Sequence, residues 1–424
     1  MKKNGINGFL LQNISYFCIV KHFRKDFCTF LGIILMMSAS VVQAQTVPAD
    51  GDAIDKHPMD SVEVSLLTCS PHEEIYSLYG HAAIRWHDQR NDTDLAFNWG
   101  MFNFKKPYFA LRFVFGLTDY ELGVVPYQYF LEEYRQCGSS VTEQVLDLTA
   151  EEKEAMYRAL SENMQPENRV YRYNFFFDNC STRPRDIIEK CLNGKIEYAQ
   201  REDYTPSHRD MISVCTRNHP WATFGNDMLL GVKADRRTTL REQEFLPGNL
   251  MYDFDRAQIV SDGTRRPLVK ERRMAVKPGV QVIEEDFPLS PTACACVLLV
   301  LSLVIIAMEW RRKKTYKYWD ALLMVVQGLA GCVLFVMIFS QHPTTSLNLQ
   351  ILLLNPLPLF FLPAVLRRRR THWWTLLIVM VVLFAVGRFF QHYAEGMMIV
   401  ALCLLLRGLV NGPFDKLRDR INEK

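Results

Sequence analysis

One cysteine stands at a position where a thiol could act as a nucleophile. Cys180 follows three phenylalanines and an Asp-Asn pair in the stretch YNFFFDNCSTRPRDII, residues 173–188. Ser181 or Thr182 can cap a helix that starts here, and Pro184 suits the first turn of that helix. Backbone N–H groups and the helix dipole favour an anion at a helix start, so the pattern predicts a reactive thiolate. The alternative is a buried cysteine that packs as a small apolar residue.

A cysteine nucleophile needs a neighbouring base, and the base needs a third group that holds its ring. His81 follows Gly80 and begins the apolar segment HAAIRWHD, so it can project from a sheet edge. The next apolar segment offers Asn98 as the group that orients His81, and His87 is a less favoured alternative. The sequence therefore predicts a catalytic set of Cys180, His81 and Asn98.

The segments around these residues have the pattern of a mixed α and β domain. Strands are predicted at residues 61–70, 81–88, 94–104 and 140–149. A helix is predicted at residues 149–164, where Thr149 is the N-cap and Glu152 completes a capping box. His81 then lies on a strand and Cys180 at a helix start, and this α+β arrangement permits the two side chains to meet.

The chain resembles the DUF4105 family, which includes the Lnb-type lipoprotein N-acyltransferases of Bacteroidota. The similar blocks are LTCSP…LYGHAAIRW, FNWGMFNF, RVYRYNFFFDNCSTRPRDII and WATFGNDMLLGVKADRRTTLREQEFLPGNL. The resemblance covers most of Val62 to Leu250 and extends to the apolar last third. It implies a circularly permuted NlpC/P60, or papain-like, domain in which the histidine precedes the cysteine, as His81 precedes Cys180. Relatives that resemble lecithin:retinol acyltransferase use this arrangement for acyl transfer through a thioester.

The resemblance implies a membrane-bound enzyme that moves an acyl chain from a phospholipid, through a thioester on Cys180, to the N-terminal amine of lipoproteins. Two alternatives stay open, namely a cell-wall amidase or peptidase of the NlpC/P60 type and a non-enzymatic membrane scaffold. We expect no metal and no other cofactor, because the sequence has no H-E-x-x-H, paired C-x-x-C or P-loop motif. The net charge of +3 does not discriminate between partners, and no nucleic acid partner is expected.

Six polar or charged residues flank the two motifs and are expected to support the site through hydrogen bonds and ion pairs. They are Arg85, Asp178, Asn179, Arg183, Arg185 and Asp186. Arg85 and Asp186 are candidates for an ion pair across the junction between strand and helix.

The N-terminus has the pattern of an export signal. Basic residues at positions 21–25 precede an apolar run at 27–42, and VVQAQ offers a cleavage site after Ala44. Residues 1–44 are therefore a predicted signal sequence and residues 46–287 a predicted catalytic domain in the periplasm. This exported part contains five cysteines, and an odd number leaves at least one thiol free in an oxidising compartment.

The last third of the chain predicts about five membrane spans. They are expected at residues 292–309, 319–340, 347–365, 373–390 and 394–409. Basic clusters follow the first, third and fifth spans, whereas the loops QHPTTS and QHYAEG lack Lys and Arg. The positive-inside rule then predicts a bacterial inner-membrane protein with a membrane domain at 292–410 and a cytoplasmic tail at 411–424. Asn355 and Pro356 are expected to break the third span, and Gln327 to bond a neighbouring helix.

Overall fold

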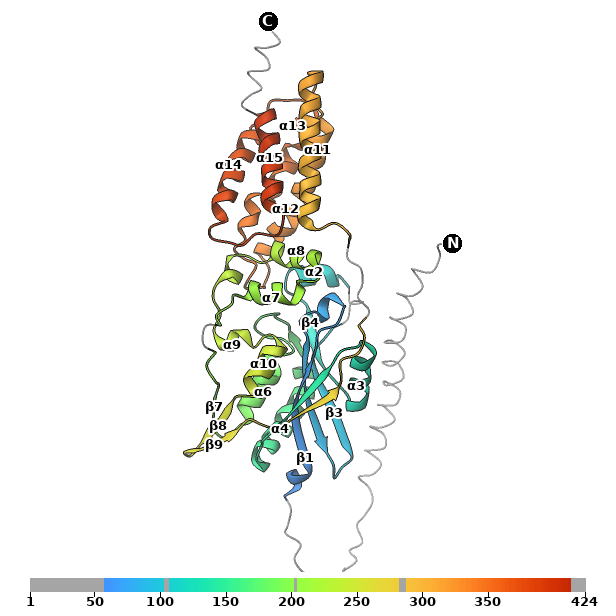
Figure 1. The fold of residues 1–424 in the computed structure, drawn as a ribbon, viewed down its shortest axis with the longest axis vertical. Coiled ribbons are helices and arrows are strands. Elements are labelled where there is room, and N and C mark those ends of the chain that lie inside the picture. Colours follow the sequence, from blue (N-terminus) through green and yellow to red (C-terminus); the bar gives the residue numbers. More distant parts are fainter. Residues whose placement is uncertain (1–56, 103–106, 202–203, 282–286, 413–424) are drawn as a thin grey trace, which may run out of the picture. The chain divides into compact units, whose positions relative to one another are not determined.

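The computed structural model describes residues 57–102, 107–201, 204–281 and 287–412. The predicted signal sequence and all but the first two residues of the predicted tail lie outside the described residues. The described chain forms an N-terminal α+β domain followed by a group of apolar helices (Figure 1). The expected fold class, an α+β domain before a helical C-terminal region, is confirmed.

An antiparallel sheet of seven strands, in the order β10-β5-β1-β2-β3-β4-β6, forms the centre of the N-terminal domain. Its strands are β1 (Val62–Cys69), β2 (His81–Asp88), β3 (Thr93–Met101), β4 (Asp119–Pro126), β5 (Val141–Leu146), β6 (Val170–Arg172) and β10 (Val269–Val276). A second sheet contains β7 (Lys195–Glu197), β8 (Gln258–Ser261) and β9 (Thr264–Pro267). The four strands predicted from the sequence correspond to β1, β2, β3 and β5.

Besides its strands, the N-terminal domain contains α-helices and 3₁₀ helices. They are α2 (Phe109–Val114), α3 (Tyr127–Gln136), α4 (Ala150–Met164), α5 (Pro166–Arg169), α6 (Thr182–Cys191), α7 (His208–Thr216), α8 (Pro220–Leu229), α9 (Leu240–Gln243) and α10 (Pro247–Phe254), with 3₁₀ helices η1 (Pro58–Ser61), η2 (Ile75–Ser77) and η3 (Val232–Asp235). The predicted helix is α4, and its capping box between Thr149 and Glu152 is present.

Alternation along β2 gives the large sheet two apolar faces. Ala82, Ile84 and Trp86 point into a core that also contains residues of α4, α6 and α10. Ala83 points into a second core, which is closed by α3 (Figure 1). Because His81 and Ala83 are two residues apart on the same strand, the histidine projects on the α3 side of the sheet.

The C-terminal region contains α11 (Pro291–Arg312), α12 (Lys317–Ile338), η4 (Leu349–Leu352), α13 (Leu357–Leu366), α14 (Trp373–Gly387) and α15 (Met397–Asn411). Among the described residues, three segments are long and apolar enough to cross a membrane, at residues 291–312, 317–338 and 349–366, and α14 and α15 are shorter apolar helices. These elements coincide with the five predicted spans to within a few residues at most ends.

The third apolar segment is interrupted between η4 and α13, as the asparagine and prolines predicted. Gln327 of α12 donates a hydrogen bond to the backbone oxygen of Leu353 (2.6 Å), and the Asn355 side chain accepts one from the backbone N–H of Leu357 (3.1 Å). These side chains satisfy backbone groups that the interruption removes from helical pairing. Gly331 permits the close approach, since a Cβ there would lie 2.2 Å from the Asn355 backbone.

A buried ionic cluster joins α11, α12 and α15, and the sequence analysis missed it. Arg407 binds Glu309 (2.7 Å) and Asp320 (2.7 Å), and all three side chains are almost inaccessible to solvent. The Glu309 carboxylate also accepts the backbone N–H of Tyr316 (2.6 Å), in the turn between α11 and α12. The sequence did not predict this cluster, because its three residues are far apart in the chain. Each of them lies near the end of a predicted span, where a charged residue is ordinarily exposed.

Amide side chains from the C-terminal region bind the backbone at the end of α8. Gln350 donates to the oxygen of Asp227 (2.8 Å), Asn348 to that of Met228 (2.8 Å) and Gln391 to that of Leu230 (3.0 Å). The last carbonyls of a helix have no partner within the helix, so these bonds satisfy them. The turns after α12 and after α14 thus attach to the N-terminal domain.

Replacement of Arg407 by Met should destabilise the helical region strongly, because it leaves Glu309 and Asp320 buried without a cation. Breaking a buried ion pair costs about 3–5 kcal/mol. The readout is the temperature at which the detergent-solubilised chain unfolds, measured beside Arg388→Met, whose side chain is exposed. Equal midpoints for the two variants would contradict the stabilising role of the cluster.

Candidate active site

The loop before α6, residues 173–181, is held in place by one asparagine. The Asn179 Oδ1 accepts the backbone N–H groups of Ser181 (2.9 Å) and Thr182 (2.9 Å). Its Nδ2 donates to the backbone oxygens of Phe175 (2.9 Å) and Phe245 (2.8 Å). Ser181, one of the two expected residues, occupies the N-cap position of α6, but its side chain makes no capping bond, and the Asn179 amide binds these N–H groups instead. The Thr182 hydroxyl in turn accepts a hydrogen bond from the backbone N–H of Asn179 (2.8 Å).

Cys180 lies at the end of the large sheet, between its own helix start and strands β2 and β3. The backbone N–H groups of Ala82 and of Cys180 itself and the Tyr173 hydroxyl lie close to its sulfur and favour its charged form. A Cβ placed on Gly100 of β3 would lie 3.8 Å from the Cys180 Cβ and 3.6 Å from the Tyr173 ring. Gly100 has φ +102°, a conformation that suits glycine, so the strand can bend closely around the thiol.

His81 and Asn98 meet at the same end of the sheet. The His81 Nε2 lies 3.1 Å from the Asn98 Oδ1. An amide oxygen only accepts hydrogen bonds, so Nε2 carries the proton and Nδ1 keeps its lone pair. The ring stacks on Tyr134 of α3 with centroids 6.4 Å apart. The N–H of Ala82, the residue directly after His81, lies near the Cys180 thiol, so the three predicted catalytic residues lie at the same end of the sheet.

The alternative orienting residue, His87, lies at the other end of β2. It is six residues from His81, which corresponds to about 20 Å along a strand. Its neighbours in the sheet are Glu63 of β1 and Asp94 of β3. Of the two candidates, only Asn98 contacts the His81 ring.

Burial leaves the cysteine and the histidine neutral at pH 7. Loss of solvent raises the pKa of the Cys180 thiol to about 11, although the bonds from Ala82, Cys180 and Tyr173 act in the opposite direction. Burial also lowers the pKa of His81 to about 4, against the bond with Asn98, which raises it. Desolvation therefore opposes the thiolate expected from the helix start, because it outweighs the effect of the favourable N–H groups. A neutral imidazole can still accept the thiol proton during attack.

The supporting residues near Cys180 form ion pairs, as expected. Arg183 binds Asp178 through two nitrogens (2.5 and 2.9 Å), and its guanidinium lies 3.5 Å from the centroid of the Tyr171 ring. This places a charged, ring-stacked pair on the outer side of the cysteine loop. It joins the first turn of α6 to strand β6.

Arg85 supports the sheet beneath His81 rather than the helix. It binds Asp94 of β3 (2.7 Å) and the buried Glu143 of β5 (2.8 Å), and it stacks on Tyr127 of α3. The suggested pair between Arg85 and Asp186 is wrong, since Asp186 binds Arg185 and Arg241 instead. Arg85 lies on the α3 face of β2, whereas Asp186 lies on α6 beyond the other face.

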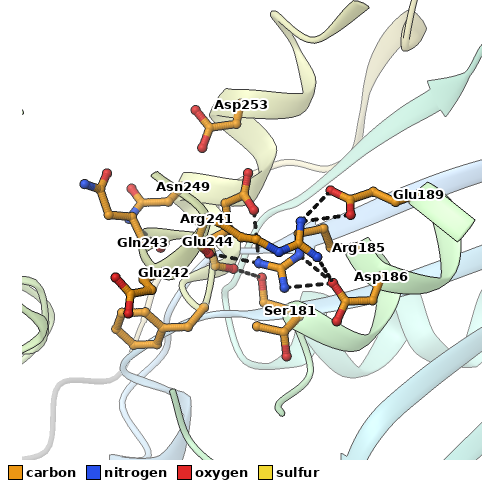
Figure 2. Close-up of polar contacts among 12 residues, drawn as sticks. Ser181, Arg185, Asp186, Glu189, Arg241, Glu242, Gln243, Glu244, Asn249 and Asp253 are labelled. Atoms are coloured by element: carbon orange, nitrogen blue, oxygen red, sulfur yellow. Dashed lines mark hydrogen bonds and ion pairs between the residues drawn. The ribbon is translucent and has the colours of Figure 1, made fainter. Parts of the chain in front are cut away.

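A second network, of ion pairs and hydrogen bonds, joins α6 to the segment between α9 and α10 (Figure 2). Buried Arg185 binds Glu244 (3.0 Å) and Asp186 (2.7 Å) and donates to the backbone oxygen of Arg241 (2.9 Å). The Ser181 hydroxyl donates to the backbone oxygen of Glu244 (2.7 Å). Burial raises the pKa of Glu244 to about 7, although Arg185 lowers it. The segment between α9 and α10 is thus part of the support for the cysteine loop.

Sequence reasoning missed several of these partners: Tyr134, Tyr173, Gly100, Glu244 and Phe245. Tyr173 and Gly100 stand inside the motif segments, and Glu244 and Phe245 inside LREQEFLPGNL, so the blocks themselves were a signal. Their roles were hidden because each acts through a contact between segments far apart in the chain.

Two family models match the chain. The Lnb N-terminal periplasmic domain matches residues 52–218, and the Lnb transmembrane domain matches residues 282–416. The chain belongs to the Lnb family. No curated protein and no solved structure matches it significantly, so the permuted papain-like topology stays a prediction.

Membership of the Lnb family establishes a membrane protein with a periplasmic N-terminal domain, and it indicates an enzyme of lipoprotein maturation. The periplasmic match includes His81, Asn98 and Cys180 and ends before Glu244. Within the described residues, no group of His, Cys, Asp and Glu has the arrangement of a metal site. All five cysteines of the periplasmic domain of this Lnb family member are free thiols in the structure: Cys69, Cys137, Cys180, Cys191 and Cys215.

The neutral resting pair predicts a distinctive pH profile for alkylation of Cys180 by iodoacetamide. Below a pKa of about 11 the thiol is protonated, so the rate should be slow near pH 7 and rise about tenfold per pH unit up to about pH 10. The measurement is peptide mass spectrometry of the folded chain, with the same peptide in the unfolded chain as reference. A fast rate that is constant from pH 5 to pH 8 would instead reveal a thiolate–imidazolium pair.

Proposed function

We propose that this Lnb family protein is a lipoprotein N-acyltransferase that uses Cys180 as nucleophile and His81 as base. It takes an acyl chain from a membrane phospholipid and transfers it to the N-terminal amine of a lipoprotein. The observation that carries the proposal is the arrangement of Cys180 at the start of α6 beside the Ala82 N–H, with the His81 ring bonded to Asn98. The match to both Lnb domains supports it, because both substrates are held in a membrane.

In the first step the Cys180 sulfur attacks the carbonyl carbon of a phospholipid ester. The Nδ1 of His81 takes the thiol proton, and Asn98 stabilises the imidazolium that forms. The tetrahedral intermediate collapses when the ester C–O bond breaks, and His81 returns the proton to the leaving lysophospholipid alcohol. The products are an acyl thioester on Cys180 and a lysophospholipid.

In the second step the N-terminal amine of the lipoprotein attacks the thioester carbonyl. His81 accepts a proton from the amine, the C–S bond breaks, and the thiol of Cys180 is restored with that proton. The product is an amide, which is more stable than the thioester, so the transfer proceeds toward the lipoprotein.

Both steps develop negative charge on an oxygen next to the sulfur. The backbone N–H groups of Ala82 and Cys180 lie near the sulfur and favour negative charge there. They are therefore the candidate donors for that oxyanion, and Tyr173 is a third donor nearby. Donors held by the backbone need no rearrangement during the reaction, which makes them effective in a site with little water.

The proposal includes a location and an orientation. The periplasmic domain extends over residues 46–287 after a signal sequence at 1–44, and the membrane domain over 292–410 in the bacterial inner membrane. The basic segments after α11 and α13 and the tail at 411–424 face the cytoplasm. The hydrogen bonds of the turns after α12 and α14 to the periplasmic domain support this orientation.

Removal of either proposed catalytic side chain should abolish transfer. Cys180→Ser and His81→Ala should each lower the rate by at least about 10³-fold, and the double variant should be no worse than the poorer single variant, because the two groups act as a unit. The readouts are mass spectrometry of lipoprotein N-termini in cells and of the purified chain, which should carry a hydroxylamine-sensitive acyl group on Cys180 after incubation with phospholipid alone.

His87→Ala is the matched control for His81→Ala and should retain full activity, since His87 lies at the other end of β2. Full N-acylation by Cys180→Ser would disprove the thioester mechanism. Unchanged lipoproteins with altered muropeptides in cells that lack the protein would favour the cell-wall amidase, and no change in either would favour the scaffold.

The orientation predicts which reporter fusions are active. A reporter that works only in the periplasm should be active when fused after Phe287 and silent when fused after Lys314, because α11 lies between these positions and basic residues follow it. Reporter activity and fusion-protein level are measured together in intact cells. The reverse pattern would invert the proposed topology of the membrane domain.

A further inference from the structure

Two short segments near the site expose large apolar side chains. In α2 and directly before it, Leu111 is 56% exposed, Phe113 47% and Tyr108 79%. In η2, Ile75 is 70% exposed and Tyr76 57%. Single exposed apolar residues are common on proteins, but clusters of them mark interaction surfaces. The position of these two segments relative to the C-terminal helices indicates what binds to them.

α2 is attached to a turn that lies at the membrane surface. The backbone N–H of Gln341 donates to the oxygen of Phe115 (3.0 Å), and the His342 Nε2 lies 3.2 Å from the oxygen of Phe113. Both residues follow closely on α12, which is long and apolar enough to span the bilayer and ends at Ile338. α2 is therefore held beside the turn that follows α12 (Figure 1).

The charge of Arg112, the charged residue of α2, is paired. Arg112 donates to the backbone oxygen of Leu117 (3.1 Å) and to the carboxylate of Asp119 (2.5 Å). A short segment that exposes apolar side chains and has its charge paired can lie in the interface of a bilayer, with its apolar side chains among the lipids. Tyrosine, as at position 108, is favoured at that depth.

η2 is tied to the same side of the domain. Tyr79, two residues after η2, accepts a hydrogen bond from Asn226 of α8 (2.9 Å), and the end of α8 is bound to the membrane region as described above. The Tyr76 ring lies 5.8 Å from the Phe102 ring, just beyond the end of β3. η2 leads directly to His81, and β3 carries Asn98 and Gly100, so both apolar segments border the strands that hold the site.

We propose that η2 and α2 form a docking surface for the periplasmic leaflet, on which the acyl chain of the donor phospholipid binds as it reaches Cys180. This inference rests on the proposed acyltransferase function and adds the route of the donor. Aliphatic and aromatic side chains match an acyl chain. The position next to α12 places these side chains at the bilayer surface, where the donor resides.

A photo-crosslinking experiment tests contact with lipid directly. The full chain carries p-benzoylphenylalanine at position 111 and is reconstituted in vesicles of phosphatidylethanolamine and phosphatidylglycerol with radiolabelled acyl chains. The Cys180→Ser background prevents turnover of the lipid. We expect labelled lipid adducts from position 111 and none from position 164, where Met164 is 42% exposed at the end of α4. Equal labelling at both positions, no lipid adduct, or adducts with protein or added lipoprotein would overturn the docking surface.

An activity measurement shows whether the contact is used. Leu111→Asp should raise KM for phospholipid about tenfold, because a carboxylate replaces a side chain that binds apolar lipid. Met164→Asp should behave like the wild type, since Met164 lies at the end of α4 outside the proposed surface. Unchanged kinetics in Leu111→Asp would overturn the route while acyl transfer itself stands. Lipid adducts at position 111 with no acyl transfer by the wild type would instead refute the proposed function and keep the membrane contact.

Discussion

The geometry around the thiol depends on the bonds of a single buried amide. Asn179 binds two N–H groups at the start of α6 and two carbonyl groups, one of them in the distant segment before α10. All four bonds lie within the protein, so loss of the amide would leave unpaired backbone groups away from water, which is costly. The adjacent Cys180 consequently has a fixed place between α6 and the end of the sheet. The network of Arg185 and Glu244 strengthens the same support.

Burial of the site determines its resting chemistry. Removal of water raises the pKa of Cys180 and lowers that of His81, so burial favours the uncharged forms of both groups. This reduces the reactivity of the thiol toward small electrophiles in the periplasm, where a permanent thiolate would be exposed to oxidation. The same low-dielectric surroundings strengthen the hydrogen bonds of Ala82 and Asn98 to any charge that develops during attack.

The C-terminal helical region is bound to the periplasmic domain at several points. Asn348, Gln350 and Gln391 bind the end of α8, and Arg407 joins three of the helices from within. A single flexible linker would attach the periplasmic domain to the helical region without fixing its orientation. Several hydrogen bonds to the end of α8 restrict the rotation of the periplasmic domain. An enzyme whose substrates both stay in the bilayer gains from such a restriction, because the reacting groups then meet at one depth.

The sequence by itself determined the elements and the main residues. Periodicity located β1, β2, β3, β5 and α4, apolar length located the membrane helices, and the motif segments singled out Cys180, His81 and Asn98. These features are local, since the types of neighbouring residues determine strand alternation, helix caps and the length of an apolar span. Only the tertiary structure decided that Asn179 caps α6, that Arg85 binds Glu143, and that the resting thiol is neutral. Each of these features depends on contacts between segments that are distant in the chain or on burial away from water. The spacing of neighbouring residues predicts neither the contacts nor the burial.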